Sequence, residues 1–284
     1  MWYVMAYNNS HYWRNKEQRA QEARDHTKYM EQKFHDEIID CVEESSVYSH
    51  CNSPFSDFNN REKEAEIILI DKDSVSAIFD YPSDMNNKSM VLNFASYKNP
   101  GGMFLKGSSA QEESLCHESY LYNVLKEFDK GFYEHNRQNK NKALYTNRAI
   151  YSEYIRFMRD EKDVFCDVLT CAAPNKAAAQ KYCNVTDRLN YSTLKERIRF
   201  VIAVAALNKP DTLILGAYGC GVFGQNPFEV AKIFKEIFDE YPCMFDRIVF
   251  AIPNRNSKNY EAFEAVFNKW LEHTRKLYQE NILN

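Results

Sequence analysis

A short segment in the middle of the chain constrains its fold more than any other. The apolar run Met90-Val-Leu has the composition of a buried strand, and it leads through Asn93-Phe-Ala-Ser into the turn Pro100-Gly-Gly. Glycine lets the backbone turn sharply and brings amide groups close to a bound molecule. Two adjacent carboxylates, Glu112 and Glu113, follow at a predicted helix start. A glycine turn that can cradle phosphate, followed by an acid pair, suits an enzyme that cleaves a molecule carrying a diphosphate.

Two further segments extend this pattern along the chain. One is Asp167-Val-Leu-Thr-Cys-Ala-Ala-Pro-Asn175, and the other is Leu215-Gly-Ala-Tyr-Gly-Cys-Gly-Val-Phe-Gly224. Together with the first loop, they resemble the microbial poly(ADP-ribose) glycohydrolases, macrodomain proteins whose catalytic loop reads Gly-Gly-Gly, a short spacer and Gln-Glu-Glu. The resemblance covers roughly residues 60 to 267. Two positions depart from the family: Met103 replaces its third glycine, and His117 stands where it usually has arginine.

The resemblance implies both a fold and an activity. The fold would be α/β, a macrodomain-like three-layer α/β/α sandwich with a central mixed sheet. The activity would be a glycosidase that hydrolyses the ribose–ribose O-glycosidic bond of poly(ADP-ribose) and releases ADP-ribose, with no metal and no cofactor. Its partners would be poly(ADP-ribose) or ADP-ribosylated proteins. Two alternatives stay open: a non-catalytic ADP-ribose-binding macrodomain, which Met103 favours, and an ADP-ribosyl hydrolase acting on modified protein or nucleic acid.

A third alternative comes from the second glycine loop. Gly219, Gly221 and Gly224 form a GxGxxG between a predicted strand and a predicted helix, which is the context of a dinucleotide-binding Rossmann turn. That fold usually has an acid at the end of the next strand, whereas here the nearby acid, Asp246, precedes that strand. In a macrodomain and in a Rossmann domain alike, such glycines let a diphosphate come close to backbone N–H groups near a helix N-terminus.

The two adjacent acids cannot share one role. Neighbouring residues on a helix point about 100° apart, so Glu112 and Glu113 cannot flank a glycosidic bond from opposite sides. By resemblance, Glu113 is the general acid that protonates the leaving ribose oxygen and then serves as base for water, while Glu112 holds ribose hydroxyls. A general acid near pH 7 needs a raised pKa, which apolar enclosure and the second carboxylate favour and the helix N-terminus opposes.

The remaining site residues are also implied by resemblance. Phe223 would stack on or shape the site of the ribose next to the scissile bond, although with 19 Phe and 19 Tyr in the chain it could equally be a core aromatic. Met103 is expected to narrow the ligand channel or move the loop. The predicted ADP-ribose contacts are Ser96, Gly101, Gly102, Gln111, Gly219, Cys220, Gly221, Val222 and Phe223.

Composition limits the kind of protein. The chain has 284 residues and a net charge of -4, so it has no overall positive charge to attract a polyanion. A bound polyanion must instead be held by local backbone amides. Eight cysteines without a CxxC indicate reduced, buried thiols rather than a metal site or disulfides. The apolar N-terminus is too short and lacks the basic residues of a signal peptide, and no run reaches transmembrane length. We expect a cytoplasmic monomer without membrane contact.

The chain is predicted to divide into an N-terminal helical extension, residues 1–60, and a catalytic domain, residues 61–284. Residues 14 to 46 carry an apolar stripe at helical spacing, predicted to pack on the main domain, and residues 47 to 60 read as a loop. The polar, mildly basic segment 134–148 also reads as a solvated loop. Predicted strands are Ile67–Ile70, Val75–Phe79, Met90–Phe94, Val164–Cys171, Thr212–Gly216 and Arg247–Ile252. Predicted helices are Gln111–Phe128, Thr193–Leu207, Pro227–Glu240 and Asn259–Tyr278.

Overall fold

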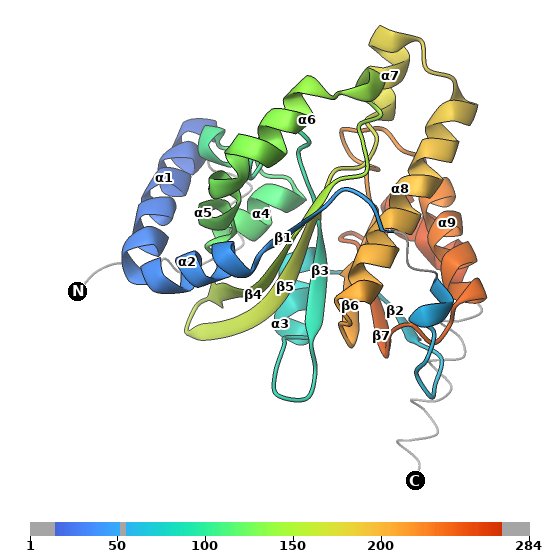
Figure 1. Ribbon diagram of the computed structural model, residues 1–284, viewed down its shortest axis with the longest axis horizontal. Coiled ribbons are helices and arrows are strands. Elements are labelled where there is room, and N and C mark those ends of the chain that lie inside the picture. The colour runs from blue at the N-terminus through green and yellow to red at the C-terminus, as the bar shows by residue number, and fades with distance from the viewer. Residues whose placement is uncertain (1–14, 52–54, 269–284) are drawn as a thin grey trace.

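The computed structural model describes residues 15–51 and 55–268, which form one mixed sheet enclosed by helices (Figure 1). The sheet order is β1-β4-β5-β3-β6-β7-β2. The five strands from β5 to β2 are parallel, and β4 joins antiparallel to both β5 and β1. The strands are β1 (Ser46–Tyr48), β2 (Glu66–Ile70), β3 (Ser89–Phe94), β4 (Ala149–Arg159), β5 (Lys162–Cys171), β6 (Thr212–Leu215) and β7 (Arg247–Ala251).

Helices cover both faces of the sheet, as the predicted three-layer α/β/α sandwich requires (Figure 1). One face packs against α1 to α5, and the other packs against α8, α9 and a helix that begins at residue 258 and is described through residue 268. The α-helices are α1 (Lys16–Lys33), α2 (His35–Glu44), α3 (Ser74–Asp80), α4 (Gln111–His117), α5 (Leu121–Leu125), α6 (Glu134–Gln138), α7 (Lys176–Cys183), α8 (Asp187–Leu207) and α9 (Pro227–Glu240).

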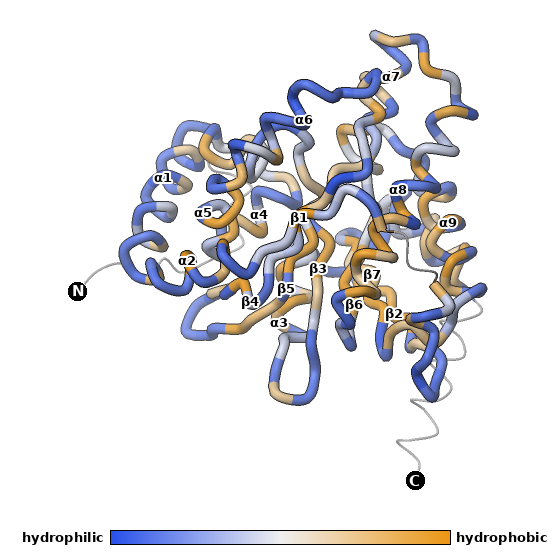
Figure 2. Tube along the Cα trace, viewed as in Figure 1, coloured by the Kyte–Doolittle hydropathy of each residue, from blue (hydrophilic) through white to orange (hydrophobic). Residues whose placement is uncertain are grey.

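The central strands are buried on both faces, so their apolar residues alternate between two cores. In β3, Met90 and Leu92 belong to the core under α8 and α9, whereas Val91 belongs to the core under α1 to α5. This explains why the strand reads as a continuous apolar run rather than an alternating one. Figure 2 shows the same contrast, with apolar strands at the centre and a largely polar α1 at the periphery.

The apolar stripe of residues 14 to 46 packs on the main domain, as predicted. It is divided between two helices that meet at Phe34, and its members Ala23, Met30, Ile38 and Cys41 are buried. The predicted domain boundary at residue 60 stays a prediction. The first seven residues, and the part of the predicted last helix beyond residue 268, lie outside the described residues.

Two predicted elements were wrong. Residues 75–79 form helix α3 rather than a strand, because Asp73 caps it by accepting a hydrogen bond from the Ser76 amide, 2.9 Å away. A short apolar run cannot distinguish a buried strand from a buried helix by periodicity alone. The single helix predicted from Gln111 is broken into α4 and α5. Strand β4 was missed, because charged residues and a bulge near Ser152 interrupt its pattern.

Candidate functional site

Three loops that carry the sequence motifs leave the carboxyl ends of adjacent strands. β3 lies between β5 and β6, and the loops after these strands hold Ser96, Pro174 and Gly219. The side-chain Nε2 of Gln225 donates to the carbonyl of Pro174, 2.8 Å away, and the main-chain amide of Ala177 donates to the carbonyl of Phe223, 3.1 Å away. The sheet therefore assembles the motifs at its carboxyl edge, the usual ligand-binding position in an open α/β sheet.

Gln111 anchors the acid-bearing helix to the end of β3. The pairing of β3 with β6 ends at Val91, and Gln111 takes over beyond it. Its Nε2 donates to the Leu92 carbonyl at 2.9 Å, and its Oε1 accepts from the Phe94 amide at 2.8 Å. The side-chain amide thus replaces a missing strand neighbour and satisfies both backbone groups. The structure gives Gln111 an orienting role, while direct ligand contact stays a prediction.

Both carboxylates approach the backbone of Gly102. A Cβ placed on Gly102 would lie 2.6 Å from Oε1 of Glu113 and 2.8 Å from Oε2 of Glu112. Gly101 and Gly102 have φ of +60° and +63°, a region that favours glycine. A Cβ on Gly101 would also lie 2.8 Å from the ring of Tyr122. Each of these glycines is therefore required both by its backbone conformation and by its packing.

Each carboxylate is held by different loop amides. Glu112 accepts from the Ser96 amide at 2.7 Å, and Glu113 accepts from the amides of Met103 at 2.8 Å and Ala110 at 3.0 Å. The two side chains are almost fully buried. The hydroxyl of Ser96 accepts from the amides of residues 98 and 99, so this side chain shapes the turn. Its predicted contact with ADP-ribose stays a prediction.

The electrostatic environment favours a proton on Glu112. Burial raises the pKa of Glu112 well above its ordinary value; hydrogen bonds from the Ser96 amide and the Asn93 side chain oppose this shift, and the charge of Glu113 adds to it. The sequence placed the proton donor at Glu113 by resemblance. Glu112 can therefore hold a proton at pH values where an isolated glutamate is ionised.

The second glycine loop presents backbone amides that make no hydrogen bond within the described residues. Gly219 and Gly224 have φ of +75° and +71°, and a Cβ on Gly219 would lie 2.8 Å from the Cβ of Ala173. Within the described residues, the amides of Gly221, Val222 and Phe223 donate no hydrogen bond. Consecutive free amides in a glycine turn form an anion-binding concavity. Burial raises the pKa of the Cys220 thiol to about 12, so that side chain adds no negative charge.

Two aromatic residues that the sequence analysis did not select connect these loops. Tyr97 and Tyr145 stack with ring centroids 4.1 Å apart, and Tyr145 meets Phe223 edge-on at 6.1 Å. Tyr97 could have been found, since it lies inside the first motif. Tyr145 could not, because it lies in the polar segment predicted to be a solvated loop. Phe223 is half-buried and packs both against this pair and against the edge of the main core.

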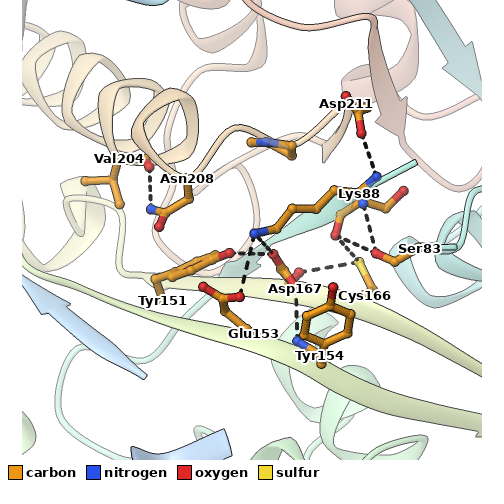
Figure 3. Close-up of polar contacts among 12 residues, drawn as sticks. Ser83, Lys88, Tyr151, Glu153, Tyr154, Cys166, Asp167, Val204, Asn208 and Asp211 are labelled. Atoms are coloured by element: carbon orange, nitrogen blue, oxygen red, sulfur yellow. Dashed lines mark hydrogen bonds and ion pairs between the residues drawn. The ribbon is translucent and has the colours of Figure 1, made fainter. Parts of the chain in front are cut away.

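A second cluster of charged side chains lies near the amino-terminal end of β3 (Figure 3). Asp167 is buried and accepts from the Tyr151 hydroxyl at 2.5 Å and from the Tyr154 amide at 3.0 Å, and the Lys88 ammonium lies 3.3 Å away. Burial raises the pKa of Asp167, although these partners oppose the shift. Tyr154 has φ of +50°, so the carboxylate fixes the bulge between β4 and β5. The cluster is structural and separate from the acid pair.

Neither a metal site nor a membrane-spanning helix is present in the described residues. No group of three or more His, Cys, Asp or Glu side chains in residues 15–51 and 55–268 is placed to hold a metal ion. None of the helices in the described part of the chain is both long and apolar enough to span a membrane.

Comparison with known proteins identifies the family. Residues 11–160 match the family model described as "Microbial-type PARG, catalytic domain". The structure of poly(ADP-ribose) glycohydrolase from Thermomonospora curvata is similar with a TM-score of 0.77 and 26% identity, over 88% of this chain and 100% of that chain. The same enzyme bound to the inhibitor ADP-HPD gives a TM-score of 0.74 and 27% identity, over 88% of this chain and 99% of that one.

A second relative is the Deinococcus radiodurans poly(ADP-ribose) glycohydrolase in complex with ADP-ribose. It has a TM-score of 0.71 and 30% identity, over 82% of this chain and 97% of that chain. No curated protein matches the sequence. The strand order differs from the 3-2-1-4-5-6 order of a Rossmann domain, which removes the oxidoreductase alternative. With more than half of its length matched by the family model, the chain belongs to the microbial-type poly(ADP-ribose) glycohydrolase family.

Proposed function

We propose that this protein is a poly(ADP-ribose) glycohydrolase that hydrolyses the ribose–ribose O-glycosidic bond of the polymer and releases ADP-ribose. One observation carries the proposal: two buried carboxylates converge on Gly102, in a chain that belongs to this family. A carboxyl group that retains a proton near neutral pH can supply general-acid catalysis. No metal or cofactor enters this mechanism.

In the proposed mechanism, Glu113 protonates the ribose oxygen that leaves as its bond to the anomeric carbon breaks. Water then attacks that carbon, and Glu113 takes the proton that the water releases, which restores the acid. Glu112 binds ribose hydroxyls, and Gln111 orients the helix that carries both acids. The amides of Gly221, Val222 and Phe223 receive the diphosphate, and the Phe223 ring faces the ribose.

The substrate is proposed to be poly(ADP-ribose) or an ADP-ribosylated protein. We further propose that the enzyme acts as a monomer in the cytoplasm. The eight cysteines, all of them within the described residues, are free thiols, and thiols persist in a reducing compartment.

The decisive experiment measures release of ADP-ribose from labelled polymer by the purified protein. Glu113→Gln keeps the shape of the side chain but removes the acid, so turnover should fall by roughly 10²–10⁴-fold with little change in the Kd for ADP-ribose. Glu112→Gln should weaken binding as well as turnover. Glu127→Gln, at an exposed acid outside the site, is the matched control.

Two results would contradict the proposal. A folded protein whose thermal unfolding and calorimetry show no response to millimolar ADP-ribose would exclude both hydrolysis and simple binding. A protein that binds ADP-ribose but never releases it from polymer would be a non-catalytic binder, or would act on a different ADP-ribosyl linkage. Near-full activity in Glu113→Gln would show that another group is the general acid.

A further inference from the structure

Helix α1 packs directly on the backbone of the catalytic loop. Gly107 has φ of +76°, and a Cβ placed on it would lie 2.0 Å from the carbonyl oxygen of Lys16 and 3.0 Å from the amide of Ala20. A side chain at position 107 would therefore collide with the backbone of the helix. Gly107 therefore permits a contact between two backbone segments that are far apart in the sequence.

Arginine side chains of α1 reinforce this contact. The Nε of Arg19 donates to the carbonyl of Gly107 at 2.8 Å, and Nη1 of Arg24 reaches the carbonyl of Leu105 at 3.5 Å. Hydrogen bonds from a charged donor are stronger than those between neutral groups. Arg19 is half-buried and makes the shorter bond, whereas Arg24 is exposed. Arg19 is thus the principal side-chain link between the helix and the loop.

The loop segment from Met103 to Ser108 is a compact turn. The amides of Lys106 and Ser108 both donate to the carbonyl of Met103, at 3.0 and 3.2 Å. The ring of Phe104 within this turn is buried. These contacts link the residues of the turn to one another, and the Gly107 carbonyl faces α1 at one end. At its other end, the Met103 amide donates to Oε1 of Glu113 at 2.8 Å.

We propose that Arg19 is a positioning residue of the catalytic centre, which holds the Gly107 carbonyl and thereby keeps the Met103 amide on Glu113. This inference rests on the proposed function of Glu113. Small displacements of a catalytic group can lower the rate by up to about 10²-fold, because the reacting geometry is narrow. The effect should therefore appear in the chemical step rather than in substrate binding.

Other contacts hold α1 in place without Arg19. His26 Nε2 donates to the carbonyl of Ser119 at 2.9 Å, and Glu31 accepts from Asn123 at 2.9 Å and from Lys126 at 2.6 Å. These contacts lie farther along the helix and attach it to α5 and to the residues on either side of it. A substitution at Arg19 should leave α1 docked and loosen only the catalytic loop.

The test uses the full chain with Arg19→Ala, Arg19→Lys and the control Lys28→Ala, which removes the same charge from an exposed position of the same helix. Rates on poly(ADP-ribose) separate kcat from KM, calorimetry gives the Kd for ADP-ribose, and hydrogen exchange reports on residues 103–113. For Arg19→Ala we expect kcat to fall by about 10–100-fold with KM and Kd within about 3-fold, and faster exchange in that segment. Arg19→Lys should be intermediate, and Lys28→Ala should match the wild type.

Two kinetic results would overturn the inference. In one, Arg19→Ala retains kcat within about 2-fold. In the other, its loss of kcat is accompanied by an equal loss of ADP-ribose affinity and a large fall in Tm, which indicates general destabilisation. A wild-type protein without turnover would instead refute the proposed function. In that case exchange alone decides: faster exchange confined to residues 103–113 supports the link from Arg19 to the loop, and unchanged exchange refutes it.

Discussion

The main-chain amide of Met103 donates a 2.8 Å hydrogen bond to the carboxylate of Glu113. Every residue except proline carries this donor, so the contact survives the replacement of the family's third glycine. Met103 has φ of −112°, which any L-residue adopts, unlike Gly101 and Gly102. The backbone thus accommodates the departure without strain. Only the Met103 side chain, which is 38% exposed, can affect the ligand.

Met103→Gly is expected to raise turnover on polymer or widen the range of substrates, because it removes a flexible side chain beside the acid pair. The cost in stability should be roughly 0.5–1 kcal/mol from backbone entropy. The turnover rates of folded protein on polymer check this expectation. Met103→Ala is the control, because it shortens the side chain but keeps the backbone restricted. An unchanged or lower rate would mean that the methionine is accommodated.

Gly102→Ala should abolish most of the activity. Its Cβ would lie within 2.8 Å of an oxygen of both Glu112 and Glu113, and the positive φ costs about 1–2 kcal/mol in addition. Gly131→Ala is the matched control, since Gly131 has φ of +90° but nothing within 4 Å of its Cβ position. Initial rates and thermal unfolding of both variants separate the two effects. Equal activity in the two variants would show that the carboxylates tolerate displacement.

Tyr145→Leu should weaken ADP-ribose binding by about 2–10-fold, because the ring that supports Phe223 is lost. The segment around it is strained: Asn141, Lys142, Ala143 and Tyr145 all have φ between +43° and +64°. Such strain persists where packing over-determines the backbone, and it clusters at functional sites. Calorimetry measures the Kd for ADP-ribose in this variant and in the control Tyr29→Leu, which alters an exposed tyrosine on α1. Equal Kd values in the two variants would leave Tyr145 with a purely structural role.

Acidification should weaken the attachment of α1 to α5. The hydrogen bond from Lys126 and then that from Asn123 lower the pKa of Glu31 from 4.5 to about 2. Because the folded-state pKa is depressed, this stabilisation is complete above about pH 4.5 and is lost as the pH falls toward 2. The Tm difference between wild type and Glu31→Gln should therefore shrink between pH 6 and pH 3. A difference independent of pH would show that the carboxylate charge does not matter.

The sequence by itself identified the segments that the structure brings together at the carboxyl edge of the sheet. The local sequence was sufficient, because the glycines, the acid pair and the strand before them lie within about twenty residues. A positive φ is also visible in the sequence, because it favours glycine. The continuous apolar runs of β3 and β6 correctly predicted a sheet covered on both faces. The start and end of α9 were also correct, because Asn226 caps it and Pro227 fits its first turn.

Only the tertiary structure decided how these segments meet. Tyr145 supports Phe223 from 78 positions earlier in the chain, and Arg19 reaches Gly107 across 88 positions. Neither contact could be predicted from the neighbouring sequence. A half-buried tyrosine, or an arginine on a polar helix, occupies the same kind of sequence position whether or not its side chain contacts a distant residue. The state of the acid pair is also a tertiary property: burial favours a proton on Glu112, and burial depends on every element that packs around it.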